Sequence, residues 1–78
     1  MPLVRFVPVE ETLYSPEIGT YHSFGIRALE KQSGKWVETA FVSDVCCERA
    51  FVDRLAEQCR QRQVAPCHLL DVVLDGLE

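Results

Sequence analysis

Long apolar runs are absent from this sequence, and so are the motifs that mark common enzymes. The longest apolar stretches are four or five residues, far short of the roughly 20 that a membrane-spanning helix needs. The N-terminal stretch MPLVRFVPVEE combines two prolines with early acids and does not resemble a signal peptide. No glycine-rich phosphate loop, GxSxG, HExxH or paired-carboxylate constellation occurs. The sequence therefore predicts a cytoplasmic, non-enzymatic protein without membrane spans.

An excess of basic residues is also missing. Eight Lys and Arg against twelve Asp and Glu give a net charge of −4, which argues against non-specific nucleic-acid binding, although a local basic patch remains compatible with it. A chain of 78 residues predicts one small domain, residues 1–78, with little room for a deep pocket beside its core. We therefore predict no cofactor.

The stretch Thr20 to Ser43 has the period-two alternation of an antiparallel hairpin turning at Ser33-Gly34, where Gly34 supplies the positive φ that such turns need. The predicted pairs on one side are Ile26 with Phe41, Ala28 with Thr39, and Glu30 with Val37. Those on the other side are Arg27 with Ala40, Leu29 with Glu38, and Lys31 with Trp36.

The rest of the chain supplies one more strand and two helices. Leu3–Tyr14 alternates like a strand interrupted near Pro8, and a turn at Ser15–Gly19 leads into the hairpin. From Ser43 to Gln63 the period becomes helical, with an apolar stripe of Cys47, Phe51, Leu55 and Cys59. Pro66 starts a second helix with an apolar face of Leu70, Val73, Leu74 and Leu77. We predict an α+β fold in the order β-β-β-α-α, a three-stranded antiparallel meander with both helices on one sheet face.

The alternation predicts that one hairpin face enters the core, and its members are Phe24, Ile26, Ala28, Val37 and Phe41. The opposite face carries Tyr21, Arg27, Leu29, Lys31, Trp36, Ala40 and Val42, which is more apolar than a solvated sheet face usually is. Three explanations remain open. The N-terminal segment covers this face or Trp36 lies flat under Lys31, the face is an oligomer interface, or it binds another protein.

Two functional hypotheses use that second face. The first is a protein-interaction or regulatory module, homodimeric or with another protein partner, whose interaction residues are Tyr21, Arg27, Leu29, Lys31, Trp36 and Val42. The alternative is a single-stranded nucleic-acid binder, in which aromatic stacking with basic neighbours uses Tyr21, Arg27, Lys31, Lys35 and Trp36. No motif of known single-strand-binding modules is present.

The four cysteines give little support to a metal or catalytic site. On one helix Cys47 and Cys59 would lie about 18 Å apart, too far to share a zinc ion. A smaller cluster of Cys59, Cys67 and His68 remains open, and so does a half-site of His68, Asp71 and Asp75. A nucleophilic Cys46 or Cys47 would need a base, and only His22 and His68 exist. We assign no catalytic or metal-binding residue.

Three segments, LYSPEIGTYHSFGI, AFVSDV and VAPCHLLDVVLDGLE, resemble a family of small uncharacterised proteins from Gram-positive anaerobic bacteria. The resemblance spans Leu13 to the end of the chain. In this sequence the YGI-like element of the family is spread over Tyr21–Ile26. The resemblance implies one compact unit and no assigned activity, and it draws attention to Gly25 and His68.

Overall fold

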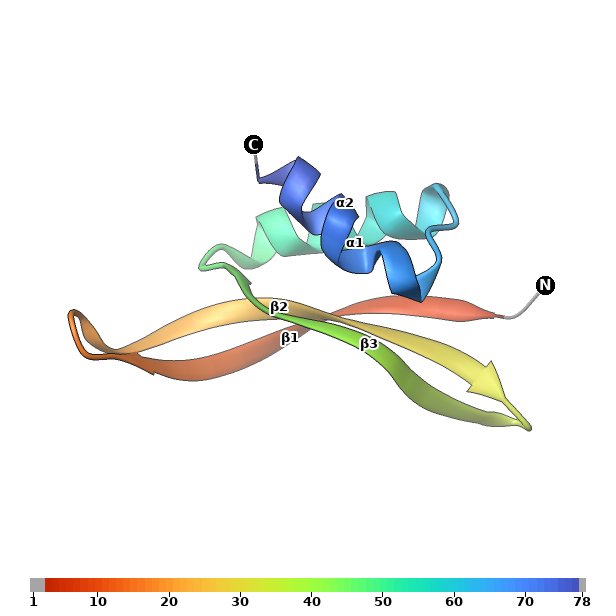
Figure 1. The fold of residues 1–78 in the computed structure, drawn as a ribbon, viewed down its shortest axis with the longest axis horizontal. Helices are drawn as coiled ribbons and strands as arrows, with labels where there is room; N and C mark the ends of the chain where they lie inside the picture. The colour runs from red at the N-terminus through yellow and green to blue at the C-terminus, as the bar shows by residue number, and fades with distance from the viewer. Residues whose placement is uncertain (1–2, 78) are drawn as a thin grey trace.

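The computed structural model describes residues 3–77 (Figure 1). Three strands, β1 (Val4–Ser15), β2 (Gly19–Gln32) and β3 (Lys35–Cys46), precede helix α1 (Arg49–Gln61), a single 3₁₀ turn η1 (Pro66–His68) and helix α2 (Leu69–Gly76). The strands form one antiparallel sheet in the order β1-β2-β3, and both helices lie on the same side of it. The predicted α+β meander with two C-terminal helices is confirmed. No helix within the described residues has the length and apolarity to cross a membrane.

Strand β1 runs without interruption through Pro8, where the sequence predicted a break. The amide of Lys31 donates to the carbonyl of Leu3, a residue directly opposite it, so the odd-numbered residues of β1 direct their backbone groups at β2. Pro8 is even-numbered and sits at the free edge of the sheet. Its missing N–H therefore costs no ladder bond, as expected for proline in an edge strand.

The β2–β3 hairpin has the predicted pairing only near its turn. Lys31 pairs with Trp36 and Glu30 with Val37, but a β-bulge between Ala28 and Leu29 shifts the register by one. Ala28 then pairs with Ala40 instead of Thr39, and Ile26 with Val42 instead of Phe41. Because side chains alternate along a strand, this shift exchanges the faces of the β3 residues from Ala40 to Val42, ahead of the next irregularity.

A second irregularity lengthens β3. The sequence predicted a helical period from Ser43, whereas the strand continues to Cys46. Asp44 has a φ of 54° and lies beside a register shift between Phe24 and Ile26. Helix α1 starts only at Arg49, so Cys47 precedes it and is exposed. The helix has no side-chain cap at Glu48.

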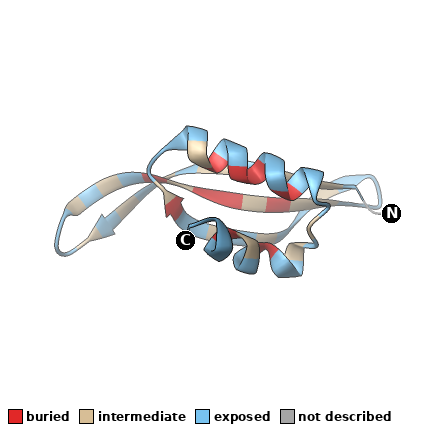
Figure 2. Cartoon of the chain, turned by 90° about the horizontal axis from the view of Figure 1, so that it is seen from above, coloured by how far each residue is buried: buried red, intermediate tan, exposed pale blue. Residues whose placement is uncertain are grey.

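The core lies between the sheet and the two helices (Figure 2). Its buried members come from β2, β3 and both helices: Ile26, Ala28, Val45, Val52, Leu55, Cys59, Leu69 and Val73. Phe6, Ala40 and Val42 pack against them from the sheet. Burial of each larger aliphatic side chain stabilises the fold by about 1.5–3 kcal/mol.

Helix α2 presents a different face to the core from the one predicted. Leu69 and Val73 are buried, while Leu70, Leu74 and Leu77 are each about half exposed. Of the predicted apolar face only Val73 enters the core. The apolar residues occupy two adjacent stripes of this helix, and the hydrophobic pattern alone could not tell which stripe faces the sheet.

Candidate functional site

The sheet has one side that no helix covers, and we call it the outer face (Figure 1). The strand pairing assigns side chains to it, because paired residues point to the same side of a sheet. Its members are Arg5, Val7, Val9, Glu11 and Leu13 of β1, Tyr21, Ser23, Gly25, Arg27, Leu29 and Lys31 of β2, and Trp36, Glu38 and Phe41 of β3.

One end of the outer face is cationic. The guanidinium carbon of Arg5 lies 4.3 Å from the centre of the Trp36 ring, and the Lys31 ammonium lies 5.9 Å from it. Both distances fit cation–π contacts, which contribute about 0.5–1 kcal/mol at exposed sites. Within residues 3–77 neither cation has a carboxylate within ion-pairing distance. Two uncompensated positive charges therefore flank Trp36.

Arg27 and Glu38 form an ion pair next to that end, with 2.8 Å between Nε of Arg27 and Oε1 of Glu38. The same Nε is buried and makes no hydrogen bond of acceptable geometry with any described residue. The contact is thus Coulombic rather than directional. Because the two side chains are 42% and 48% exposed, a pair of this kind contributes at most about 1 kcal/mol.

The middle of the outer face is mainly apolar, with Arg27 lying between Val7 of β1 and Phe41 of β3. Val7 and Phe41 are 36% and 43% exposed, and Val9 and Leu29 are half-buried beside them. Gly25 lies under this cluster, because a Cβ built there would be 3.1 Å from Cε1 of Phe41 and 2.5 Å from the carbonyl oxygen of Val42. Glycine at this position allows the Phe41 ring and β3 to approach β2 closely.

The other end is acidic and organised around Asp44. Its Oδ2 accepts a hydrogen bond of 2.6 Å from the Tyr21 hydroxyl, and its Oδ1 accepts one of 2.7 Å from Ser23. The carboxylate of Glu11 accepts bonds of 2.8 Å from the Ser43 hydroxyl and from the Asp44 amide. The network joins all three strands and holds the backbone of Asp44 in its left-handed conformation.

These bonds shift two pKa values in opposite directions. The hydrogen bond from Tyr21, and then that from Ser23, lower the pKa of Asp44, because both favour the ionised carboxylate. The bond to Asp44 raises the pKa of Tyr21, because it holds the phenolic proton. No Lys or Arg of the described part of the chain pairs with Glu11 or Asp44, so this end carries two uncompensated negative charges.

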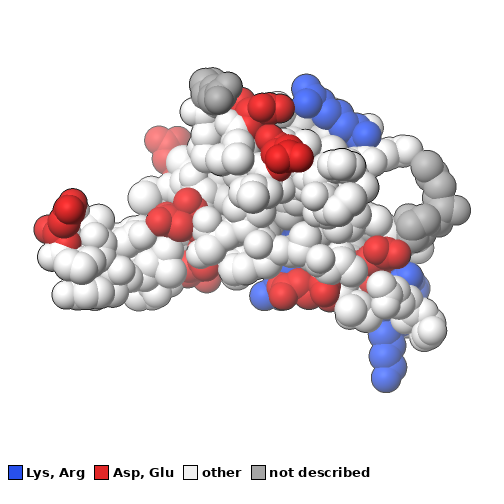
Figure 3. All heavy atoms as spheres, in the orientation of Figure 1, with Lys and Arg blue, Asp and Glu red and all other residues white. Residues whose placement is uncertain are grey.

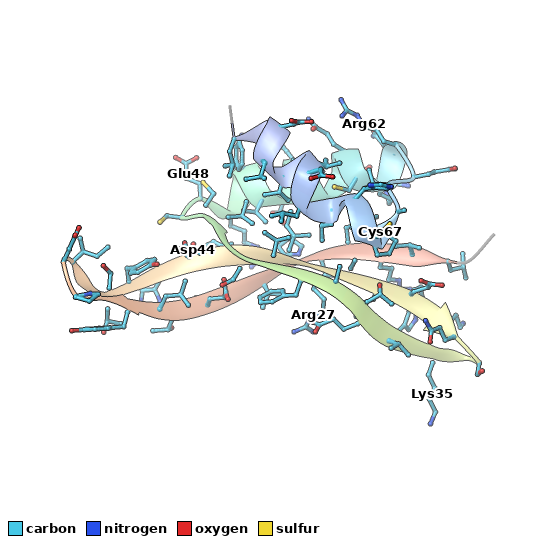
Figure 4. All side chains as sticks on the ribbon, viewed as in Figure 1. Arg27, Lys35, Asp44, Glu48, Arg62 and Cys67 are labelled. Carbon is cyan, nitrogen blue, oxygen red and sulfur yellow. The ribbon has the colours of Figure 1, made fainter. Side chains whose placement is uncertain are left out.

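Figure 3 shows the resulting separation of charge. In this view Lys and Arg lie below the sheet toward the β2–β3 turn, with acidic side chains beside them, while the half that carries the β1–β2 turn shows Asp and Glu but no Lys or Arg. Figure 4 shows Arg27 and Lys35 pointing away from the helices, Lys35 from the tip of the β2–β3 hairpin.

The structure places five of the predicted interaction residues on the outer face: Tyr21, Arg27, Leu29, Lys31 and Trp36. The placement of Val42 there was wrong. Val42 packs against the core because of the bulge, and so does Ala40. Phe41, predicted for the core, takes their place outside. Arg5 and Glu11 were missed because the predicted meander places β1 beside β2 but does not fix the register that pairs Arg5 with Leu29 and Glu11 with Ser23.

The candidate chemical residues do not form a site. Cys59 is buried, whereas Cys67 and His68 are exposed. No three His, Cys, Asp or Glu side chains between residues 3 and 77 are grouped so that they could hold a metal ion. Cys46 accepts a hydrogen bond from the Glu48 amide, and all four cysteines are free. His68 lies 4.0 Å from Asp71 on an exposed helix surface.

The candidate site is thus the exposed outer face of the sheet. Residues 8–78 match a family described as "Family of unknown function (DUF6514)", a match that begins upstream of the predicted resemblance at Leu13. No match is found among curated proteins or among solved structures. Since the family match covers far more than half of the sequence, the chain belongs to the family of unknown function DUF6514.

Proposed function

We propose that this protein is a non-enzymatic interaction module that uses its outer face to bind a second copy of the same chain. The observation that carries the proposal is the layout of that face: an apolar middle containing Phe41, between a cationic end around Trp36 and an acidic end around Asp44.

Charge complementarity selects a second copy as the partner. A two-fold axis that lies in the interface plane, perpendicular to the strands and through the apolar middle, would place the cationic end of one protomer over the acidic end of the other in an isologous interface. Arg5 and Glu11 are six residues apart on β1, or about 20 Å at 3.3 Å per residue. Val7 and Phe41 would then meet their symmetry mates near the axis, where interfaces are usually most apolar.

The size of the face suits such an interface. A standard protein interface covers about 800 Å² per partner. That is about a seventh of this chain's accessible surface of 5417 Å², an area that one side of a small sheet can supply. In the monomer the helices cover one side of the sheet, and the side chains of the outer face stay in contact with water. Packing two such sheets face to face would bury those side chains.

Single-strand nucleic-acid binding is the alternative, and it would use Tyr21, Arg27, Lys31, Lys35 and Trp36. Arg5 already lies over the Trp36 ring, so a base would have to displace it to stack there. The acidic end would also repel a phosphate backbone. An absorbance ratio at 260 and 280 nm on purified protein, followed by a salt series, tests this alternative directly.

Size-exclusion chromatography with light scattering at two protein concentrations tests self-association. We expect a dimer that weakens as salt is raised, because its charged ends attract across the interface. Trp36→Glu and Phe41→Glu should weaken dimerisation by about thirtyfold or more, the effect of losing an interface hot spot. Val37→Glu is the matched control, because Val37 is 40% exposed on the same strand but belongs to the other side of the sheet.

A monomer at the highest concentration would contradict the proposal. A loss of several kcal/mol in the free energy of unfolding of Trp36→Glu would instead place Trp36 in the core. We also propose that the protein comes from a bacterium, as the family resemblance implies. We place it in the cytoplasm, because free cysteines such as the four seen here are typical of that reducing compartment.

A further inference from the structure

A cavity of about 400 Å³ lies on the helix side of the sheet, away from the outer face. It is open to solvent on one side and is lined by the start of β1, the end of β2 and the segment that joins α1 to η1. The lining residues are Leu3, Val4, Phe6, Glu30, Arg60, Gln63, Val64, Ala65 and Pro66. This volume lies at the lower end of the roughly 300–1,000 Å³ range of small-molecule sites.

One wall of the cavity is fixed by the end of α1. The Gln63 amide donates to the carbonyl of Arg60, and the Val64 amide donates to the carbonyl of Cys59. Gln63 has a φ of 53°. These are the two bonds and the left-handed residue of a Schellman motif, which turns the chain sharply and directs Val64 back toward the sheet. Pro66 then fixes the start of η1, so the wall is preformed.

The charges around the cavity are unequal. The Arg60 guanidinium is held by Glu57 through two hydrogen bonds, one of them 3.0 Å from Nε to Oε2, so its charge is compensated. Glu30 projects from β2 at the opposite wall and is half-buried. Its carboxylate has no ion pair and no side-chain hydrogen bond with any residue of the described range 3–77. The cavity therefore combines an apolar lining with one uncompensated negative charge.

We infer that this cavity binds a small apolar molecule carrying one protonated amine. The apolar part would occupy the space between Phe6 and Val64, and the ammonium group would donate to the Glu30 carboxylate. An ammonium supplies both the positive charge and the donors that a half-buried carboxylate lacks, whereas a carboxylate ligand would be repelled. The site is on the opposite side of the sheet from the proposed dimer interface, so the two proposals stand or fall separately.

Titration of ¹⁵N-labelled protein with hexylamine, hexan-1-ol and hexanoate, followed by amide NMR shifts, tests the inference. The three probes share a six-carbon chain and differ in their head group. We expect shifts centred on Phe6, Glu30 and Val64, with hexylamine binding about tenfold more tightly than hexan-1-ol. This ratio corresponds to about 1.4 kcal/mol, near the lower end for hydrogen bonds to charged groups. Hexanoate should bind more weakly than the alcohol.

Two variants make the test specific. Glu30→Gln should reduce the preference for hexylamine to near unity and leave the affinity for hexan-1-ol unchanged, and Glu48→Gln, an exposed acid elsewhere, should change neither. Ala65→Phe should fill the cavity and weaken both ligands, and its thermal unfolding would show that it remains folded. Equal affinities for hexylamine and hexanoate, shifts away from the cavity, or no saturable binding would each overturn the inference.

Discussion

Replacing Gly25 by alanine should damage the sheet where β2 and β3 approach most closely. The new Cβ would lie 2.5 Å from the carbonyl oxygen of Val42 and 3.1 Å from Oε2 of Glu11. Val42 is paired with Ile26, so its carbonyl cannot retreat without disturbing the ladder. Glu11 can move only by weakening its bonds to Ser43 and Asp44.

The magnitude follows from these contacts. Overpacking a well-packed site costs about 1–3 kcal/mol, and weakening a hydrogen bond to a charged group adds about 1.5–3 kcal/mol. Alanine also lowers the conformational entropy of the unfolded chain, which offsets about 0.4–1 kcal/mol of this loss in stability. We expect Gly25→Ala to lower the free energy of unfolding by about 3 kcal/mol. A 78-residue domain has about 4–12 kcal/mol in total, so this loss would remove between about a quarter and three quarters of the stability.

Urea denaturation followed by circular dichroism measures this loss. Gly76→Ala is the matched control, because the Cβ added there would meet only the flexible end of Leu55, at 2.9 Å. That variant should stay within about 1 kcal/mol of the parent, since alanine is also the better helix former. A Gly25→Ala variant as stable as Gly76→Ala would refute the close approach of β3 to Gly25.

Four further predictions concern the acidic network, the end of α1 and the thiols. Because the folded pKa of Asp44 is lowered, its stabilisation is present above the usual value of 3.8 and is lost as the pH falls through the lowered pKa, so Tyr21→Phe should flatten the acid limb of a pH–stability profile. The raised pKa of Tyr21 gives stabilisation that is complete below 10.0 and declines as the pH rises through the raised pKa, which Asp44→Asn should remove from the alkaline limb. Gln63→Gly should raise the free energy of unfolding by about 0.5–1 kcal/mol in urea denaturation, because glycine adopts the positive φ without strain; a destabilised variant would contradict the Schellman geometry. Iodoacetamide should modify the exposed Cys47 rapidly and Cys59 only after unfolding, because burial hides that thiol and raises its pKa; equal rates by mass spectrometry would contradict the packing of α1.

The order of elements was predictable because its signals are local. The alternation of β2 and the turn at Ser33-Gly34 fix a hairpin, and steps of four from Phe51 to Cys59 fix a helix. The strand that continues through Asp44 was not predictable. Its left-handed residue is held by Glu11, 33 positions earlier in the chain, and by Tyr21. The residues next to Asp44 in the sequence show only a pattern typical of a helix N-cap, which predicts the start of a helix and not a continuing strand.

The candidate site was predictable to the extent that it depends on β2. Tyr21, Arg27 and Lys31 alternate on a strand without bulges of its own, so their common face follows from their numbers. The cavity beside Glu30 was not predictable, because its walls come from β1, β2 and the α1–η1 turn. Their contact is a property of the folded chain and leaves no periodic signal.

The bulge before Ala40 decides the character of both sheet faces. Trp36 and Phe41 are five positions apart, so in a regular strand they would point to opposite sides. The bulge brings both aromatic rings to the outer face and turns Ala40 and Val42 toward the helices. Burying the Phe41 side chain fully would stabilise the fold by roughly 1.5–3 kcal/mol, and an isolated domain lacks part of this contribution because Phe41 is exposed. The smaller Ala40 packs against the core in its place. In the proposed dimer the outer face would be covered and Phe41 would be buried. The bulge would then stabilise the dimer, because it places Phe41 on that face.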